Sequence, residues 1–217
     1  MVRSRRELAV TLSRAPLFPY PKRGLEQYVT DGETASELLW EAYMRGDIRG
    51  RVVLDLGCGT GVLAVGSAIL GADHVICLDV DEGALVEAYR WAHSEGVLDR
   101  LSYVAMLVPD VWMRAVDTIV MNPPFGVYRR GADTMFLRTA LKLRPRAIYT
   151  IHMSDRGTRE VVRRTAQGAG YAAQILSTRS IMIPQLYESH RRRVYRVTVD
   201  LYRISAVSYT HLTLPTN

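Results

Sequence analysis

The sequence predicts an α/β fold, built as one doubly wound, mostly parallel sheet of seven strands with a C-terminal antiparallel hairpin. Short apolar runs alternate with amphipathic stretches between residues 52 and 169, which is typical of a parallel sheet covered by helices on both faces. A glycine-rich segment, Gly57–Gly61, follows the first of these runs. The last two extended segments have no helix between them, so we expect them to pair as an antiparallel hairpin at one edge.

The first part of the chain is predicted to contain two helices joined by a loop. A short helix is expected over residues 3–13, followed by an ordered loop over 17–28 that is rich in proline, glycine and aromatic residues. The second helix should extend to about Arg45. Thr30 and Glu33 have the spacing of a capping box, which predicts Thr30 as the cap of that helix.

Strands and helices then alternate along the chain. We expect strands over residues 52–55, 74–79, 101–106, 117–121 and 146–152, and the two hairpin strands over 171–181 and 194–203. The helices between them are expected over residues 61–70, 82–95, 133–143 and 154–169, the last of them capped by Ser154. The segment 107–115 fits neither period.

The length of 217 residues fits a single domain with a sizeable core. We assign residues 1–204 to that domain. Residues 205–217 continue no element, and we expect a disordered or non-native tail. No apolar stretch reaches the roughly 18 residues needed to span a bilayer, and no apolar segment of a signal peptide follows the basic N-terminus. A cytoplasmic protein is expected.

The chain carries a formal net charge of +6, and almost all of its positive charge is arginine, since Lys22 and Lys142 are the only lysines. The arginine fork matches phosphate, so a nucleic-acid partner is a reasonable hypothesis. An arginine-rich codon usage would give the same composition. Clusters at Arg3–Arg6 and Arg191–Arg196 favour the nucleic-acid interpretation, although charge runs are also common on solvated faces.

Two cysteines, Cys58 and Cys77, fall inside predicted core elements. Their spacing is not that of a metal site or of a disulfide framework. We therefore predict neither a bound metal nor a disulfide.

The glycine loop predicts a nucleoside cofactor. Gly57, Gly59 and Gly61 follow a strand and open a helix, where glycine allows close backbone approach to a ligand. Asp79 ends the next strand, where a carboxylate can accept hydrogen bonds from both ribose hydroxyls. A dinucleotide loop usually has its third glycine one residue later, and Asp55 suits a cationic ligand better than a diphosphate. S-adenosylmethionine is therefore favoured over NAD, although a loop-capping role for Asp55 fits both.

The segment Asn122-Pro123-Pro124-Phe125 follows the apolar run 117–121. Two adjacent prolines cannot continue a central strand, so a rigid turn is predicted at the carboxyl edge of the sheet. The Asn122 side-chain oxygen and the Pro123 carbonyl can accept hydrogen bonds from a planar amine, and Phe125 can stack on a base. Alone, the segment is equally compatible with a tight loop and a core phenylalanine. Its chain order behind the glycine loop and Asp79 favours a methyl-acceptor site.

Together these residues resemble the small-subunit ribosomal RNA adenine-N6 methyltransferases of the methyltransferase-like-five type and their archaeal relatives, which are class I S-adenosylmethionine-dependent enzymes with a Rossmann-like fold. The resemblance covers about residues 3–204. It is carried by the segments Leu25–Thr30, Asp55–Leu63 with Leu70–Ala72, Asp79–Asp81 and Met121–Gly126, and by His152, Ser154, Thr158–Glu160, Ile183, Pro184, Tyr187, His190 and the arginine run.

The resemblance implies roles for particular residues. Gln27, Tyr28 and Thr30 would fold over the cofactor site, Gly57, Thr60 and Val62 would line it, and Asp79 would hold the ribose. Asn122–Phe125 would receive a flipped adenine. Eukaryotic members of the family work with a small zinc-binding activator protein that covers an apolar edge of the sheet, so a similar partner is expected here. One departure is Met106, which stands where the family has an acid near the cofactor's adenine; Asp110 is the nearest candidate to replace it.

Further residues are candidates for RNA contact. Arg129 and Arg130 closely follow the proline turn, and Tyr187, His190, Arg191, Arg192 and Arg193 lie in the predicted hairpin loop. Aromatic residues among arginines suit single-stranded RNA. A packed tyrosine with solvated arginines would be the alternative.

The sequence thus predicts an S-adenosylmethionine-dependent adenine-N6 methyltransferase that acts on structured RNA, most plausibly small-subunit ribosomal RNA. Guanine N2 and protein glutamine are alternative acceptors, because the turn suits any planar nitrogen. A non-catalytic RNA-binding or assembly module that kept the fold is the alternative from another class, and Met106 is the feature that favours it.

Overall fold

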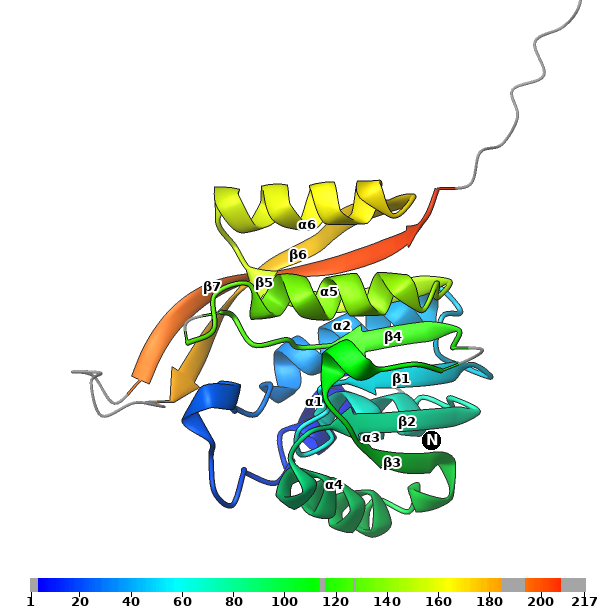
Figure 1. Cartoon of the computed structure of the whole chain (residues 1–217). Helices are drawn as coiled ribbons and strands as arrows, with labels where there is room; N and C mark the ends of the chain where they lie inside the picture. The colour runs from blue at the N-terminus through cyan, green and yellow to red at the C-terminus, as the bar shows by residue number, and fades with distance from the viewer. Residues whose placement is uncertain (1–3, 114–115, 127, 185–193, 208–217) are drawn as a thin grey trace, which may run out of the picture.

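The computed structural model describes residues 4–113, 116–126, 128–184 and 194–207. Within them one sheet of seven strands runs in the order β3-β2-β1-β4-β5-β7-β6 (Figure 1). Strands β1 to β5 are parallel, whereas β7 is antiparallel to both β5 and β6. The strands are β1 (Val52–Leu56), β2 (His74–Asp79), β3 (Leu101–Ala105), β4 (Thr118–Met121), β5 (Ala147–Met153), β6 (Tyr171–Pro184) and β7 (Val194–Ala206).

In the described part of the chain, six α-helices cover the two faces of this sheet. One apolar cluster joins α1 to α4 to one face, and a second joins α5 and α6 to the other. The helices are α1 (Arg5–Leu12), α2 (Gly32–Met44), α3 (Val62–Ile69), α4 (Glu82–Ser94), α5 (Ala132–Lys142) and α6 (Arg156–Gly168), with short 3-10 turns η1 (Arg23–Leu25), η2 (Leu98–Arg100) and η3 (Val108–Asp110).

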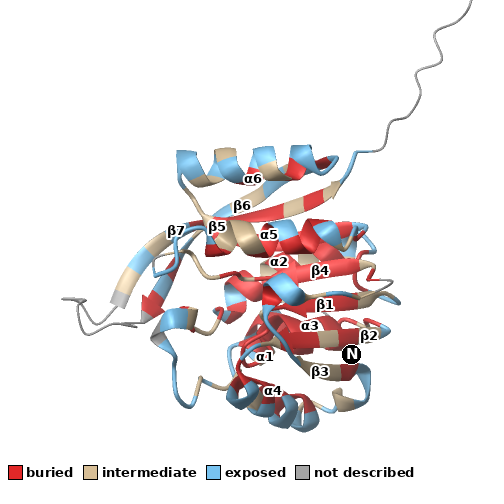
Figure 2. Ribbon diagram, viewed as in Figure 1, coloured by how far each residue is buried: buried red, intermediate tan, exposed pale blue. Residues whose placement is uncertain are grey.

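The central strands are buried on both faces (Figure 2). In β1, Val53 joins the cluster under α1 to α4, while its neighbours in the strand, Leu54 and Leu56, join the cluster under α5 and α6. This alternation follows from the two-residue period of a strand, and it explains why the strands appear in the sequence as continuous apolar runs.

The predicted parallel sheet and its C-terminal hairpin are confirmed. Both hairpin strands are longer than expected, because each continues to pair beyond its apolar stretch. β7 reaches Ala206, and residues 208–217 lie outside the described part, so the nature of the tail stays a prediction. Among the described residues, no helix is both long and apolar enough to cross a membrane.

Two predicted helix caps are wrong by one residue. The Asp31 carboxylate, not the Thr30 hydroxyl, accepts the hydrogen bond from the Thr34 N–H at 2.9 Å and caps α2. Likewise Asp155, rather than Ser154, accepts from Thr158 N–H at the start of α6. Aspartate is a strong N-cap residue, and in the first case the Thr30 side chain is engaged elsewhere.

The order of the strands creates a switch point between β1 and β4. After β1 the chain moves outward through β2 and β3, and it then returns to place β4 on the other side of β1. In such sheets ligands bind beyond the carboxyl ends of the strands at this crevice.

Candidate active site

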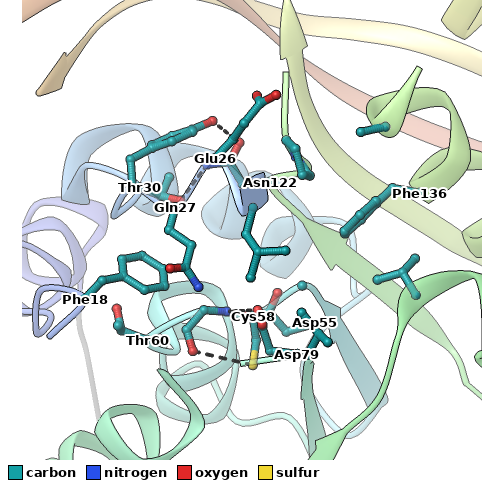
Figure 3. Close-up of a pocket in the computed structure, with 18 of the residues that line it drawn as sticks. Phe18, Glu26, Gln27, Thr30, Asp55, Cys58, Thr60, Asp79, Asn122 and Phe136 are labelled. Carbon is teal, nitrogen blue, oxygen red and sulfur yellow. Dashed lines mark hydrogen bonds between the residues drawn. The ribbon is translucent and has the colours of Figure 1, made fainter. Parts of the chain in front are cut away.

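A pocket lies at the carboxyl ends of β1, β2 and β4, and the loop before α2 forms its opposite wall. Figure 3 shows Asp55, Cys58 and Asp79 on one side and Gln27, Thr30 and Asn122 across from them. The lining also includes a set of mainly apolar residues: Phe18, Leu25, Val29, Val62, Leu63, Val80, Leu107, Val108, Pro109, Pro124, Met135 and Phe136.

The glycine loop folds back onto β2. The backbone N–H groups of Gly57 and Cys58 both donate to the Leu78 carbonyl, at 2.8 and 2.9 Å. Gly57 and Gly59 have positive φ angles of 78° and 52°. A Cβ on Gly57 would lie 2.6 Å from the Phe136 ring, and one on Gly59 would lie 2.7 Å from the Phe18 ring. Glycine is therefore required both by the backbone conformation and by the close approach of two aromatic rings.

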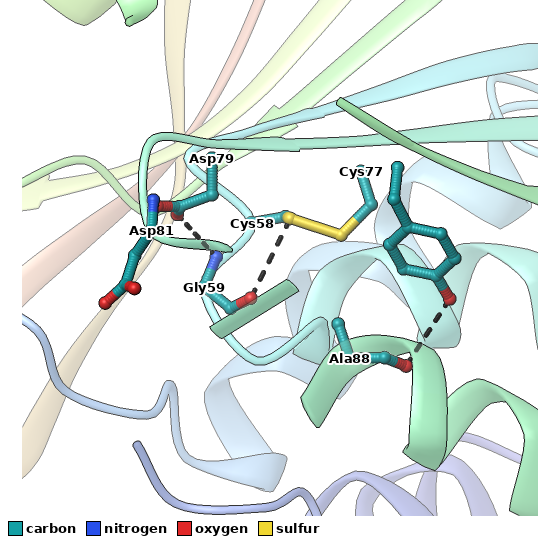
Figure 4. The surroundings of a disulfide bond; sticks show 7 residues. Cys58, Gly59, Cys77, Asp79, Asp81 and Ala88 are labelled. Atoms are coloured by element: carbon teal, nitrogen blue, oxygen red, sulfur yellow. Dashed lines mark hydrogen bonds between the residues drawn. A yellow bond between two sulfur atoms is a disulfide. The ribbon is translucent and has the colours of Figure 1, made fainter. Parts of the chain in front are cut away.

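A disulfide joins Cys58 in the glycine loop to Cys77 in β2, which corrects the prediction that the cysteines do not pair (Figure 4). The loop turns back across the end of the neighbouring strand, which brings the two Cα atoms to 5.5 Å, within the range for a disulfide. The sequence did not reveal this, because the cysteines belong to different elements. The bond ties the loop to the strand that carries Asp79.

Asp55 is buried and lines the pocket. Neither of its carboxylate oxygens accepts a hydrogen bond of ordinary geometry from the described residues. Burial raises the pKa of Asp55 well above its usual value; the nearby backbone N–H of Ala64 offsets part of the rise, and the charge of Asp79 adds to it. A buried carboxylate without a partner is costly, so this side of the pocket is chemically suited to a cation.

Asp79 lies at the end of β2 and is fixed by two backbone donors. Gly59 N–H donates to one carboxylate oxygen at 2.8 Å, and Asp81 N–H donates to the other at 2.9 Å. Burial raises the pKa of Asp79, and these N–H groups counteract the rise. Each oxygen keeps a lone pair for a ligand hydroxyl.

Gln27 contributes to the pocket wall but its amide is already engaged. Its Nε2 donates to Asp81 Oδ2 at 2.7 Å, and its Oε1 accepts from the Lys22 N–H at 2.7 Å. Burial opposes the charge on Asp81, but the hydrogen bonds from Gln27 and Lys22 outweigh it and lower the pKa of Asp81. Gln27 therefore fastens the loop before α2 over the site.

The Asn122 side chain is held between two residues of that same loop. Tyr28 Oη donates to Asn122 Oδ1 at 3.1 Å, and Asn122 Nδ2 donates to Thr30 Oγ1 at 2.9 Å. Both ends of the amide are thus oriented, and its oxygen keeps a second lone pair. All three residues line the pocket, and the hydroxyl groups of Tyr28 and Thr30 are hydrogen-bonded to Asn122.

The remaining residues of the proline turn occupy different positions. Pro124 lines the pocket and Pro123 is buried outside the lining. Phe125 is half-buried, and its ring lies 5.4 Å from the Tyr28 ring, centroid to centroid. The ring therefore supports Tyr28 in this structure, and it is not part of the pocket lining where a base was expected to stack.

Most of the predicted glycine-loop residues line the pocket. Gly57, Gly59, Thr60 and Val62 are among them, whereas Gly61 is not. Gly61 caps α3 with φ of 91°, and a Cβ there would lie 2.9 Å from the Ala88 Cβ. Its requirement for glycine is therefore structural.

The pocket wall formed by the residues after β3 is apolar. The resemblance implies an acidic residue at the position of Met106. Met106 is 37 % exposed, and the residues that line the pocket here are Leu107, Val108 and Pro109. Asp110 is exposed and lies outside the lining, so among the described residues it does not take the place of the acid. The Met106 N–H donates to the Asp79 carbonyl at 3.0 Å, which fixes the start of this wall.

The candidate RNA-binding residues fall into two groups. Arg129 lines the pocket and Arg130 is exposed next to it. Tyr187, His190, Arg191, Arg192 and Arg193 lie outside the described residues, so their assignment stays a prediction.

Several pocket residues were given no role by the sequence reasoning, and three of them make contacts that shape the site. Phe18 and Phe136 come from distant elements and approach the glycine loop only after folding. Glu26 is buried, and its Oε1 accepts from the Tyr128 N–H at 2.7 Å. Glu26 also has a positive φ of 51°. This backbone conformation is uncommon for a residue other than glycine, and nothing in the sequence predicted it. Glu26 ties the loop before α2 to the segment after the proline turn.

The fold, the glycine loop, the paired carboxylates and the asparagine turn define a class I S-adenosylmethionine-dependent methyltransferase. The residues fit that cofactor: the orphaned carboxylate of Asp55 lines the pocket and suits a cationic group of a ligand, and Asp79 offers two oxygens to hydroxyl groups. The apolar wall 107–109 suits a purine ring.

Comparisons with known proteins agree with this assignment. The rRNA N(6)-adenosine-methyltransferase METTL5 of Danio rerio is 31 % identical over 205 residues, covering 92 % of this chain and 98 % of its own. The uncharacterised protein MJ0284 of Methanocaldococcus jannaschii is 32 % identical over 94 % of this chain and 95 % of its own. The crystal structure of PH1948 from Pyrococcus horikoshii, described as a candidate RNA methyltransferase, superposes with a TM-score of 0.88 at 39 % identity, covering 96 % and 100 % of the two chains.

A family model of the ribosomal protein L11 methyltransferase (PrmA) also matches, over residues 35–123 only. That region holds the glycine loop and ends at the proline turn, so it covers the part shared by many methyltransferases. The full-length matches are more informative. The chain belongs to the METTL5 family of rRNA N6-adenosine methyltransferases.

Proposed function

We propose that this enzyme transfers a methyl group to the exocyclic N6 of an adenine in small-subunit ribosomal RNA, and that it works in the cytoplasm, where ribosomes are found. The observation that carries the proposal is the Asn122 amide, held on both sides by Tyr28 and Thr30 and exposed to a pocket that suits S-adenosylmethionine. The full-length likeness to METTL5 supports adenine as the acceptor.

The acceptor nitrogen of adenine is a weak nucleophile, because its lone pair is delocalised into the ring. In the proposed mechanism the free lone pair of Asn122 Oδ1 accepts one N6–H and the Pro123 carbonyl accepts the other, which bends the nitrogen towards tetrahedral geometry. Since Tyr28 and Thr30 already fix the amide, little reorganisation is needed when the base arrives. Positioning and preorganised electrostatics then supply most of the rate enhancement. The target base must leave its stack to reach this turn.

S-adenosylmethionine would supply an electrophilic methyl group on a sulfonium: the S–C bond would break as the N6–C bond forms, S-adenosylhomocysteine would leave, and the methylated N6 would lose one proton to solvent. Asp55 is suited to pair with its cationic end, Asp79 to accept from the ribose hydroxyls, and Leu107 to Pro109 to flank the adenine. Gly57, Gly59 and Thr60 line the site. Gln27 holds the covering loop in place through Asp81.

Exchange of Asn122 for alanine tests the role of the amide. We expect Asn122→Ala to reduce methyl transfer to ribosomal RNA by at least 100-fold, in line with the loss of a preorganised polar group at a reacting centre, while S-adenosylmethionine binding changes less than two-fold by calorimetry. Ser154→Ala, outside the pocket lining, is the control. A large loss of cofactor affinity in Asn122→Ala would contradict the assignment of this residue to the acceptor.

We also propose that a small zinc-binding activator protein covers the β3 edge of the sheet. β3 is one of the two edge strands. Tyr103 and Val104 are only partly buried there, and Met106 and Leu107 just beyond it are exposed. Mixing with such a protein should give a 1:1 complex in sedimentation, and Leu107→Asp should weaken it. A complex unaffected by charge at this edge would contradict the proposed position.

The match of residues 35–123 to the L11 methyltransferases favours protein methylation as a second candidate. This second candidate rests only on residues 35–123, the region that contains the glycine loop. A protein acceptor would have to fit the same Asn122 turn, and the determination of the methylated product separates the two.

A further inference from the structure

A groove lies between α5 and α6, at the end of the two helices that is far from the pocket. α5 and α6 lie side by side on one face of the sheet (Figure 1). Both begin at the carboxyl edge of the sheet, where Ala132, Met135 and Phe136 of α5 line the pocket. The groove is formed near their C-terminal ends, by Arg138, Leu141, Lys142, Arg144, Arg164 and Thr165 together with Gly168 and Ala169.

The groove is strongly basic. Arg138, Lys142 and Arg144 are exposed, and among the described residues none of the three forms an ion pair. Arg164 is the exception, because it pairs with Glu160. No acidic side chain is part of the described groove lining. The surface therefore presents three uncompensated cations around a concave floor.

Stabilisation of the helix ends does not account for all three charges. Cations in the last turn of a helix interact favourably with its dipole, and this applies to Lys142 and Arg144. Arg138 stands one turn earlier. The spacing of four residues places Arg138 and Lys142 on one face of α5, and the first residue of this helix, Ala132, lines the pocket.

Basic residues stand near both ends of α5. Arg129 lines the pocket and Arg130 is exposed beside it, just before the helix begins. From residue 132 to residue 142 the distance along the helix is about 15 Å, at about 1.5 Å per residue. An RNA whose flipped base occupies the pocket has phosphates that extend this far on either side, since single-strand phosphates are spaced by several ångströms.

We propose that the α5–α6 groove binds the phosphate backbone of the RNA substrate, remote from the base that enters the pocket. The inference rests on the proposed action on RNA and adds a second contact, which would recognise a structured RNA by the position of its backbone and not by its sequence. Arg138 and Lys142 are the central contacts, and Arg144 supports them.

The double variant Arg138→Ala with Lys142→Ala tests the groove. Each phosphate contact contributes about 0.7–0.9 to the slope of log K against log salt, so the slope for purified small-subunit ribosomal RNA should fall by about 1.5, and the dissociation constant should rise by about 10-fold at 0.15 M salt. The apparent KM for RNA should rise with it, while kcat and S-adenosylmethionine affinity stay within two-fold of the wild type.

Two further variants serve as controls. Arg49→Ala with Arg90→Ala removes the same charge from exposed positions away from α5 and α6, and it should leave the salt slope nearly unchanged. Arg138→Lys with Lys142→Arg keeps the charge and should keep RNA binding. Circular dichroism establishes that each variant is folded.

The proposal is overturned if the groove variant binds RNA with the affinity and salt slope of the Arg49 and Arg90 control. It is also overturned if RNA binding is unchanged and the variant loses binding of a protein partner, because the groove would then be a protein-binding site. Because this experiment measures RNA binding, its outcome does not depend on whether the protein transfers a methyl group to adenine. If the wild type binds ribosomal RNA through the groove but transfers no methyl group to adenine, the proposed function fails and the groove assignment stands.

Discussion

At the scale of single residues, the acceptor turn depends on contacts that arrive from far away in the sequence. Asn122 is oriented by Tyr28 and Thr30, more than ninety residues earlier. The sequence indicated that these residues belong to one site, but it predicted a helix cap for Thr30 and a cofactor contact for Tyr28. Their hydrogen-bond partners became apparent only from the fold, because the relative position of the loop and the strand end is set by tertiary packing.

Tyr28 provides a prediction at this scale. Removal of its hydroxyl in Tyr28→Phe leaves the ring against Phe125 but frees one side of the Asn122 amide. A single hydrogen bond contributes about 0.5–1.5 kcal/mol, so kcat should fall by about 3- to 10-fold. S-adenosylmethionine affinity should be unchanged by calorimetry, and Tyr89→Phe on α4 should have no effect. An unchanged kcat would show that the amide needs no support from Tyr28.

At the scale of elements, the glycine loop is the best-predicted part of the site and also contains the largest surprise. Its position after β1 and the three glycines were evident from the sequence, since a tight turn and close backbone approach require them. The link from Cys58 to Cys77 was not. It depends on how the loop crosses the end of β2, and two cysteines alone carry no information about that geometry.

The disulfide gives a prediction for this element. Its two cysteines are 19 residues apart, and closing a loop of this size contributes about 3 kcal/mol to the free energy of unfolding. Cys77→Ser should therefore lower the melting temperature measured without reductant. Because the bond connects the loop to the Asp79 strand, we also expect weaker S-adenosylmethionine binding.

Reductant supplies the control for the disulfide. Added to the wild type, it should reproduce the melting temperature of Cys77→Ser, and added to the variant it should change nothing. Equal melting temperatures of variant and wild type under non-reducing conditions would contradict a stabilising role of the bond.

At the scale of the whole molecule, the sheet and its layers followed from the sequence. Continuous apolar runs between helical periods predict parallel strands, and the lack of a helical pattern in the sequence between the last two predicted strands predicted their antiparallel pairing. The pocket walls were less predictable, because Phe18 and Phe136 belong to elements without a chemical motif and meet the glycine loop only through packing.

The stability of the molecule should depend on pH through His152. This side chain is 1 % exposed, and its Nε2 is hydrogen-bonded to Thr150 Oγ1 at 3.0 Å. Burial lowers the pKa of His152 to about 4, against the opposing effect of the charges on Asp133 and Asp200. The unfolded chain, with a histidine pKa of about 6.5, therefore binds a proton that the folded chain does not between pH 6.5 and 4.

Acid therefore favours the unfolded chain, because the unfolded chain binds the additional proton. The free energy of unfolding falls as pH drops from 6.5 to 4, by at most about 3.5 kcal/mol from this residue, at about 1.4 kcal/mol for each unit of pKa difference. Urea unfolding of the wild type and of His152→Gln at pH 7 and pH 5 measures it. The variant should show a smaller difference between the two pH values. An identical difference in both proteins would mean that His152 is not buried in its neutral form.

The central claim is that the Asn122 turn presents an RNA adenine to the methyl donor. Incubation of the protein with tritiated S-adenosylmethionine and purified small-subunit ribosomal RNA, followed by digestion to nucleosides and chromatography, tests it most directly. We expect the label to elute with N6-methyladenosine and to be absent when Asn122→Ala replaces the wild type. Label on N2-methylguanosine, or on protein when whole ribosomal subunits are used, would contradict it.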